Sequence, residues 1–111
     1  MTYDYSRANE KFARAASTLA TSPDDINQRL FNAAYHIVAL EPEELPETMR
    51  VDFLGLRQKL TSGPPVPGGS LRNTIDRLTP AEAGAIAQAI WSFHNDLSEQ
   101  RYRELGKRTA G

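Results

Sequence analysis

The apolar residues of this chain recur at steps of three and four positions along almost its whole length. That spacing places apolar side chains on one face of an α-helix, because a helix turns once every 3.6 residues. No stretch shows the sustained alternation of polar residues with β-branched and aromatic ones that is typical of a half-buried strand. The sequence therefore predicts an all-α fold.

Capping residues, prolines and glycines divide this pattern into four longer helices and one short helix. The predicted helices span about residues 3–20, 23–40, 45–60, 70–78 and 80–104. Ser22 is predicted to cap the second helix with Pro23 in its first turn, and Pro46 is placed in the first turn of the third. Thr79 and Glu82 have the spacing of a capping box at the start of the last helix.

The connections between these helices are short enough to favour antiparallel neighbours. We therefore expect a small antiparallel four-helix bundle with one additional short helix and a Pro/Gly-rich loop over residues 61–69. Residues 1–105 form a single domain in this interpretation. Gly106 suits a left-handed helix end, so residues 106–111 are predicted to be a frayed tail.

Each of the four longer helices is predicted to bury one stripe of residues. These stripes include Ala8, Phe12 and Leu19; Leu30, Ala33, Ile37 and Leu40; Leu45, Met49, Phe53, Leu56 and Leu60; and Ala83, Ile86, Ile90, Phe93 and Leu97. A helix with one apolar face packs that face against its neighbours.

Residue composition excludes several chemistries. The chain has no cysteine, which removes disulfides, Cys-ligated zinc, iron–sulfur clusters and thiol nucleophiles. Thirteen Lys and Arg residues against fourteen Asp and Glu residues give a net charge of −1, and the main basic concentration lies within residues 101–108. Nucleic-acid binding is therefore disfavoured, because it needs a clustered cationic face; a helical accessory protein using these arginines is one alternative.

No run of about 18 apolar residues is present, so we expect no membrane span. The first fifteen residues lack the apolar stretch of about 7–15 residues that is typical of a signal peptide. These two observations predict a cytoplasmic protein.

Metal and cofactor signatures are also missing. Neither His36 nor His94 is followed at three or four positions by a carboxylate, as a histidine-based metal site on one helix face would require. The glycines at 68–69 lack the lysine and preceding strand of a phosphate-binding loop. We expect no metal, no cofactor and no small-molecule ligand.

One pair of residues suggests an enzymatic alternative. Arg29 and His36, separated by six residues, have a spacing that resembles the Arg-x(4–6)-His motif of HEPN-type ribonucleases, and the resemblance covers these two residues. It implies an all-helical fold and metal-independent RNA cleavage at a dimer cleft. His36 would then be the general acid or base, and Arg29 would stabilise the phosphorane.

Two helices carry apolar residues outside their main stripes. On the second helix these are Phe31, Tyr35 and Val38, and on the last helix they are Trp91 and Tyr102. Such residues can bind another chain, because aromatic side chains bury much area at low entropic cost. They can also pack inside the molecule, with Trp91 under the Pro-rich loop.

The sequence thus favours a non-catalytic helical bundle that mediates protein–protein interaction as a homodimer or accessory subunit. The ribonuclease built on Arg29 and His36 is the alternative.

Overall fold

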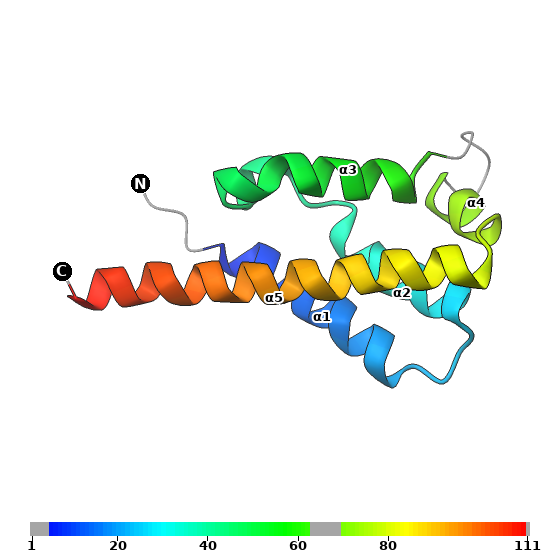
Figure 1. Ribbon diagram of the computed structural model, residues 1–111, viewed down its shortest axis with the longest axis horizontal. Helices are drawn as coiled ribbons and strands as arrows, with labels where there is room; N and C mark the ends of the chain where they lie inside the picture. The colour runs from blue at the N-terminus through cyan, green and yellow to red at the C-terminus, as the bar shows by residue number, and fades with distance from the viewer. Residues whose placement is uncertain (1–4, 63–69, 111) are drawn as a thin grey trace.

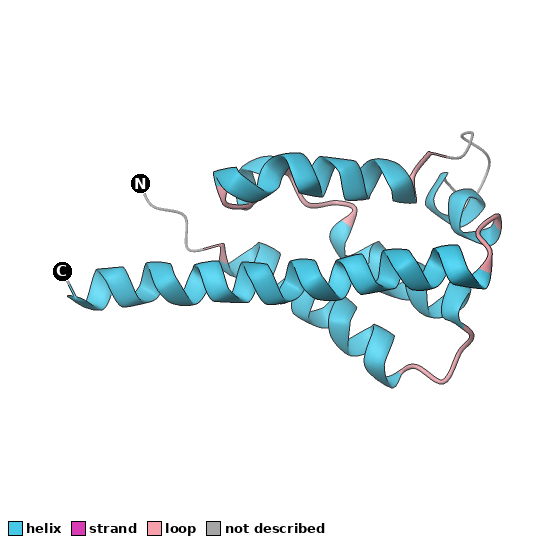
Figure 2. Ribbon diagram, in the orientation of Figure 1, coloured by secondary structure: helices cyan, strands magenta, loops and turns pink. Residues whose placement is uncertain are grey.

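The computed structural model describes residues 5–62 and 70–110, and within these ranges the chain forms five α-helices and no strand (Figures 1 and 2). The helices are α1 (Ser6–Thr21), α2 (Ile26–Ile37), α3 (Arg50–Leu60), α4 (Ser70–Asp76) and α5 (Pro80–Ala110). Two 3-10 turns, η1 (Pro42–Glu44) and η2 (Glu47–Met49), connect α2 to α3. The predicted all-α fold with four longer helices and one short one is confirmed. No helix in the described part of the chain combines the length and apolarity needed to cross a bilayer.

The long helix α5 runs across the molecule and packs against α1 and α2, which also pack against each other (Figure 1). The short helix α4 contacts both α2 and α3. Helix α3 lies on the other side of α5 from α1 in this view, beside the same long helix. The predicted stripes form one core, in which residues such as Phe12, Leu30 and Ile90 are fully buried.

Three phenylalanines join α1, α3 and α5 at the centre of this core. The rings of Phe12 and Phe93 are stacked with centroids 4.7 Å apart, and Phe53 lies 6.3 Å from Phe12 and 6.2 Å from Phe93. Aromatic rings at these distances attract each other in addition to the area they bury. This contact attaches α3 to α1 and α5.

Polar side chains close the carboxyl ends of three helices, where backbone carbonyls lack helical partners. Arg29 donates a hydrogen bond of 3.2 Å to the Leu19 carbonyl in the last turn of α1. Asn27 donates through Nδ2 to the carbonyls of Ile75 and Leu78 at the end of α4, each at 3.0 Å. Arg57 of α3 likewise donates to the Leu40 carbonyl just after α2, at 3.1 Å.

Several helix starts differ from the prediction. Helix α1 begins at Ser6 because Tyr5 has a φ of 57°, in the left-handed region that a right-handed helix cannot include. Asp25 rather than Ser22 caps α2, accepting a 2.9 Å bond from the Gln28 amide. Ser22 is instead the carboxyl-terminal cap of α1, with an extended backbone.

The predicted third helix over 45–60 is shorter than expected. Pro46 precedes η2 with a ψ of 142°, an extended conformation, so the chain turns before α3 begins at Arg50. The acidic residues before α3 differ in their surroundings. Glu41, Glu43 and Glu47 are exposed, while Glu44 pairs with Arg7 and bonds the Glu41 amide at 2.8 Å.

The capping box at the start of α5 is confirmed. The Thr79 amide donates to Glu82 at 2.9 Å, and the Glu82 amide donates to the Thr79 hydroxyl at 3.1 Å. At its other end α5 continues to Ala110, so the predicted helix end near 104 is wrong, while the frayed tail over residues 106–111 stays a prediction. Gly106 is flanked by residues that favour helix, and a glycine within a helix costs only about 1 kcal/mol.

Candidate functional site

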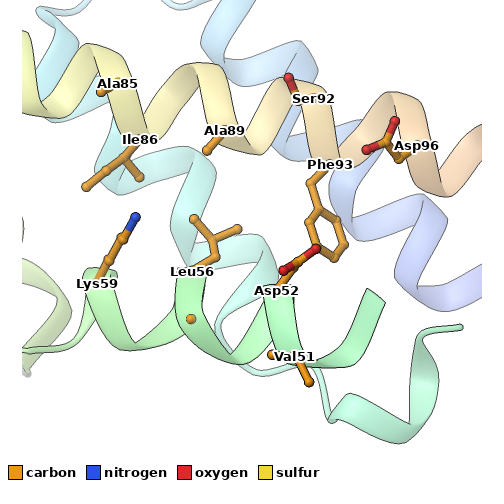
Figure 3. Close-up of a pocket in the computed structure, with 11 residues that line it drawn as sticks. Val51, Asp52, Leu56, Lys59, Ala85, Ile86, Ala89, Ser92, Phe93 and Asp96 are labelled. Carbon is orange, nitrogen blue, oxygen red and sulfur yellow. The ribbon is translucent and has the colours of Figure 1, made fainter. Parts of the chain in front are cut away.

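An open groove of about 460 Å³ lies between α3 and α5 (Figure 3). The two helices are antiparallel here, with Asp52 of α3 beside Phe93 of α5 and Lys59 beside Ile86. Figure 3 shows Leu56 pointing from α3 toward α5, and Ile86 pointing from α5 toward α3. Apolar side chains therefore form the floor of the groove.

The α5 wall of the groove carries small side chains. Ala85, Ala89 and Ser92 are exposed there, at spacings of four and three residues that place them on one helix face. On the α3 wall, a Cβ added at Gly55 would meet no atom within 4 Å other than those of its chain neighbours and the nearby backbone of its own helix. Another backbone can approach closely where side chains are this short.

Charged side chains mark the two ends of the groove. Asp52 and Asp96 lie at one end, beside Phe93, and Lys59 lies at the other, beside Ile86 (Figure 3). None of the ion pairs among the described residues includes these three groups. The groove is thus acidic at the end toward which α5 continues and basic at the opposite end.

Helix α3 also carries two exposed apolar side chains, of which Val51 lines the groove. Val51 is 80% exposed and Leu54 is 42% exposed. Neither belongs to the stripe that α3 buries. An apolar groove continuous with such residues is the kind of surface that binds another protein.

A second recess, of about 420 Å³, lies on the opposite flank of α5. Trp91, Gly84 and Gln88 of α5 face Leu19 of α1 and Arg29 of α2 across it. Trp91 is 43% exposed and lies 6.1 Å from His94, measured between ring centroids. The Pro-rich loop proposed as a cover for Trp91 lies outside the described residues.

The five predicted partner residues differ in exposure, and their role in binding stays a prediction. The Phe31 ring is covered by the Arg72 guanidinium at 3.7 Å from its centroid, and Val38 packs against the core. Tyr35 on α2 is 69% exposed and Tyr102 on α5 is 79% exposed.

Arg29 and His36 lie about 10 Å apart along the axis of α2, since a helix rises 1.5 Å per residue. Arg29 faces the end of α1 and donates to the Leu19 carbonyl, so part of its guanidinium is already bonded within the fold. Burial lowers the pKa of His36 below its ordinary value of 6.5, and Lys11 and Arg14 on α1 lower it further by repelling the imidazolium. Both residues thus interact with α1, and their catalytic role stays a prediction.

Sequence reasoning missed the groove between α3 and α5. The available signal was weak: Val51 and Leu54 lie off the main stripe of α3, and Ala85, Ala89 and Ser92 form a row of small residues on α5. Only the distance between the two helices turns these features into a groove.

No group of three or more metal-ligating side chains comes together among the residues that the structure describes. Comparison with protein-family models, curated proteins and solved structures found no match to this chain. The groove is therefore interpreted from its own geometry and charge.

Proposed function

We propose that this protein is a non-catalytic interaction module that binds an α-helix in the groove between α3 and α5. The partner is either a second copy of the chain or another protein of which this chain is an accessory subunit. The observation that carries the proposal is the open groove between α3 and α5, whose apolar floor is formed by Leu56, Ile86 and Phe93. An amphipathic helix laid in such a groove buries its apolar face there.

Two further features support a helix as the occupant. The small residues Ala85, Ala89 and Ser92 permit close approach of a second backbone along α5. The charges of Asp52 and Asp96 at one end and of Lys59 at the other favour one direction of the bound helix. In a small-molecule site, polar groups converge on one point instead of being divided between two ends.

This proposal is tested by affinity capture of binding proteins from a cell extract of the organism that produces this protein. Ala89→Trp fills the groove with a large side chain at an exposed position, so the bundle itself has room to fold. Asn95→Trp is the matched control, because Asn95 is exposed on α5 and does not line the groove.

Proteins retained by the wild type and by Asn95→Trp, but lost with Ala89→Trp, would support the groove as the binding site. The far-ultraviolet circular dichroism of all three forms must match for this comparison. Retention of the same proteins by all three forms would contradict the proposal.

A further inference from the structure

The recess on the other flank of α5 is built by three helices that are far apart in the sequence. Its lining residues are Leu19 and Ala20 of α1, Ile26 and Arg29 of α2, and Gly84, Ala87, Gln88 and Trp91 of α5. Its volume of about 420 Å³ falls in the range of small-molecule sites, roughly 300–1,000 Å³. This hollow is called the Trp91 recess below.

The α5 wall of the Trp91 recess combines open space with a large aromatic side chain. Gly84 and Trp91 are seven residues apart, so they lie two turns apart on the same face of α5. A Cβ added at Gly84 would meet no atom within 4 Å other than those of its chain neighbours and the nearby backbone of its own helix. Trp91 is 43% exposed. A ligand in the recess can therefore reach the indole.

The other walls are mostly apolar. Leu19, Ile26 and Ala87 are partly buried and pack against the core, and each also lines the recess. A hydrated inorganic ion would leave these surfaces uncovered. A ligand with an apolar or aromatic body would remove them from water.

Arg29 supplies the only formal charge among the described residues that line the recess. Its Nη1 donates to the Leu19 carbonyl at 3.2 Å, while its Nε is shielded from water and has no hydrogen-bond partner in the described part of the chain. None of the ion pairs between described residues includes Arg29. Its positive charge is therefore available to an anion.

The guanidinium of Arg29 is also held in position before any ligand arrives. The bond to Leu19 restrains the side chain, so less conformational entropy is lost on binding. A guanidinium has five N–H donors and can give two parallel hydrogen bonds to one carboxylate. These properties favour a carboxylate beside Arg29.

We propose that the Trp91 recess binds a small aromatic carboxylate. The aromatic ring packs against the indole of Trp91 and the apolar walls, and the carboxylate binds the guanidinium of Arg29. The side-chain amide of Gln88 is the second polar group of this site. The sequence alone predicts no small-molecule ligand, because the lining residues come together only where α1, α2 and α5 meet. This site is separate from the groove between α3 and α5 and does not depend on the proposed function.

Binding can be measured directly because Trp91 is the only tryptophan of the chain. Its fluorescence, excited at a wavelength that phenyl and phenol rings do not absorb, is followed during titration with 3-phenylpropionate. A saturable change is expected. The uncharged 3-phenylpropanamide and the ring-less propionate should each bind at least about tenfold more weakly, a difference of 1.4 kcal/mol or more.

Two variants on different helices locate the ligand. Gly84→Leu fills the recess with a side chain that favours a helix more than glycine does, so the fold is kept while the saturable change is lost. Gln58→Leu is the matched control, because Gln58 is exposed on α3 and lines neither the groove nor the recess. It should bind 3-phenylpropionate as the wild type does. The far-ultraviolet circular dichroism of the three proteins should be the same.

Arg29→Gln separates the charge of Arg29 from its structural role. Its dissociation constant for 3-phenylpropionate should rise at least about tenfold, while that for 3-phenylpropanamide should not change. A disturbed recess would instead weaken both ligands equally.

Absence of a saturable change in the wild type would overturn the inference. It would also be overturned if the amide bound as tightly as the carboxylate, if Gly84→Leu bound as tightly as Gln58→Leu, or if Arg29→Gln weakened both ligands equally. These outcomes leave the groove between α3 and α5 untouched, since Ala89→Trp tests that site independently.

Discussion

Single polar side chains hold the ends of neighbouring helices together in this protein. Arg29, Asn27 and Arg57 each donate to backbone carbonyls outside their own helix. A carbonyl at a helix end that is shielded from water needs such a donor, because an unsatisfied polar group is costly to bury. These residues are therefore structural, whatever else they do.

Arg29→Ala is expected to lower the free energy of unfolding by about 1–2 kcal/mol, because the Leu19 carbonyl loses its charged donor. Urea denaturation measures the change. Arg77→Ala is the control, since Arg77 is exposed, and it should change stability by less than about 0.5 kcal/mol. Equal effects of the two substitutions would show that the contact with Leu19 contributes nothing.

His36 makes stability depend on pH. Burial and the nearby Lys11 and Arg14 lower its pKa in the folded state below the ordinary value of 6.5. Just below pH 6.5 the unfolded chain therefore binds more protons at this residue than the folded chain does. The contribution of neutral His36 to the free energy of unfolding is therefore complete above pH 6.5. It is lost as the pH falls below 6.5 through the lowered pKa of the folded state.

His36→Gln should flatten this dependence. Urea midpoints of the wild type and the variant, measured from about pH 5 to 8, give the comparison. The difference between the two proteins should change with pH in the acidic part of that range. If the difference between the two urea midpoints were the same at every pH, folding would not change the pKa of His36.

At the scale of elements, the shortest helix depends most on a neighbour. Helix α4 has seven residues, too few to be stable alone, and it contacts α2 and α3. Asn27 of α2 bonds two carbonyls at its end, while Arg72 of α4 covers the Phe31 ring of α2. The docking of α4 therefore covers one face of the Phe31 ring.

Asn27→Ala should destabilise the protein by about 1–2 kcal/mol and should loosen α4 first, because the carbonyls of Ile75 and Leu78 lose their shared donor. Hydrogen exchange resolved by residue is the measurement, and the amides of α4 should exchange faster than those of α5. Asn95→Ala, at an exposed position, provides the reference. Uniform acceleration over all helices would instead indicate a global loss of stability.

At the scale of the whole molecule, the three phenylalanines hold α3 beside α1 and α5. Phe12 of α1 contacts both Phe53 of α3 and Phe93 of α5. The ring of Phe93 also lines the groove, so the same cluster that attaches α3 also closes one end of the groove floor. Core packing and the candidate site are therefore coupled.

Phe12→Ala should cost about 3–5 kcal/mol, because it removes a fully buried ring and leaves a cavity. Phe12→Leu keeps most of the volume and should cost distinctly less. Thermal or urea unfolding gives both values. A cost for Phe12→Ala close to that of an exposed substitution would contradict the central position of this ring.

Most of the helices and their buried faces could be predicted from the sequence, because periodicity, capping boxes and prolines act over a few residues. The stripe from Leu45 to Leu60 and the Thr79–Glu82 box are examples. Helix boundaries were predicted less accurately where a residue that can interrupt a helix lies among residues that favour one, as at Pro46 and Gly106. Either residue can interrupt a helix, and only its neighbours decide whether it does.

The candidate site depended on tertiary structure. The sequence by itself determined that α3 and α5 are amphipathic. The groove between them exists because Phe53 contacts Phe93 and Arg57 bonds the Leu40 carbonyl, which together fix the position of α3 relative to α5. Likewise, contacts more than 40 residues apart in the chain covered Phe31 and left Tyr102 exposed. Which apolar residues remain on the surface is set by non-local packing, and helical periodicity carries no information about it.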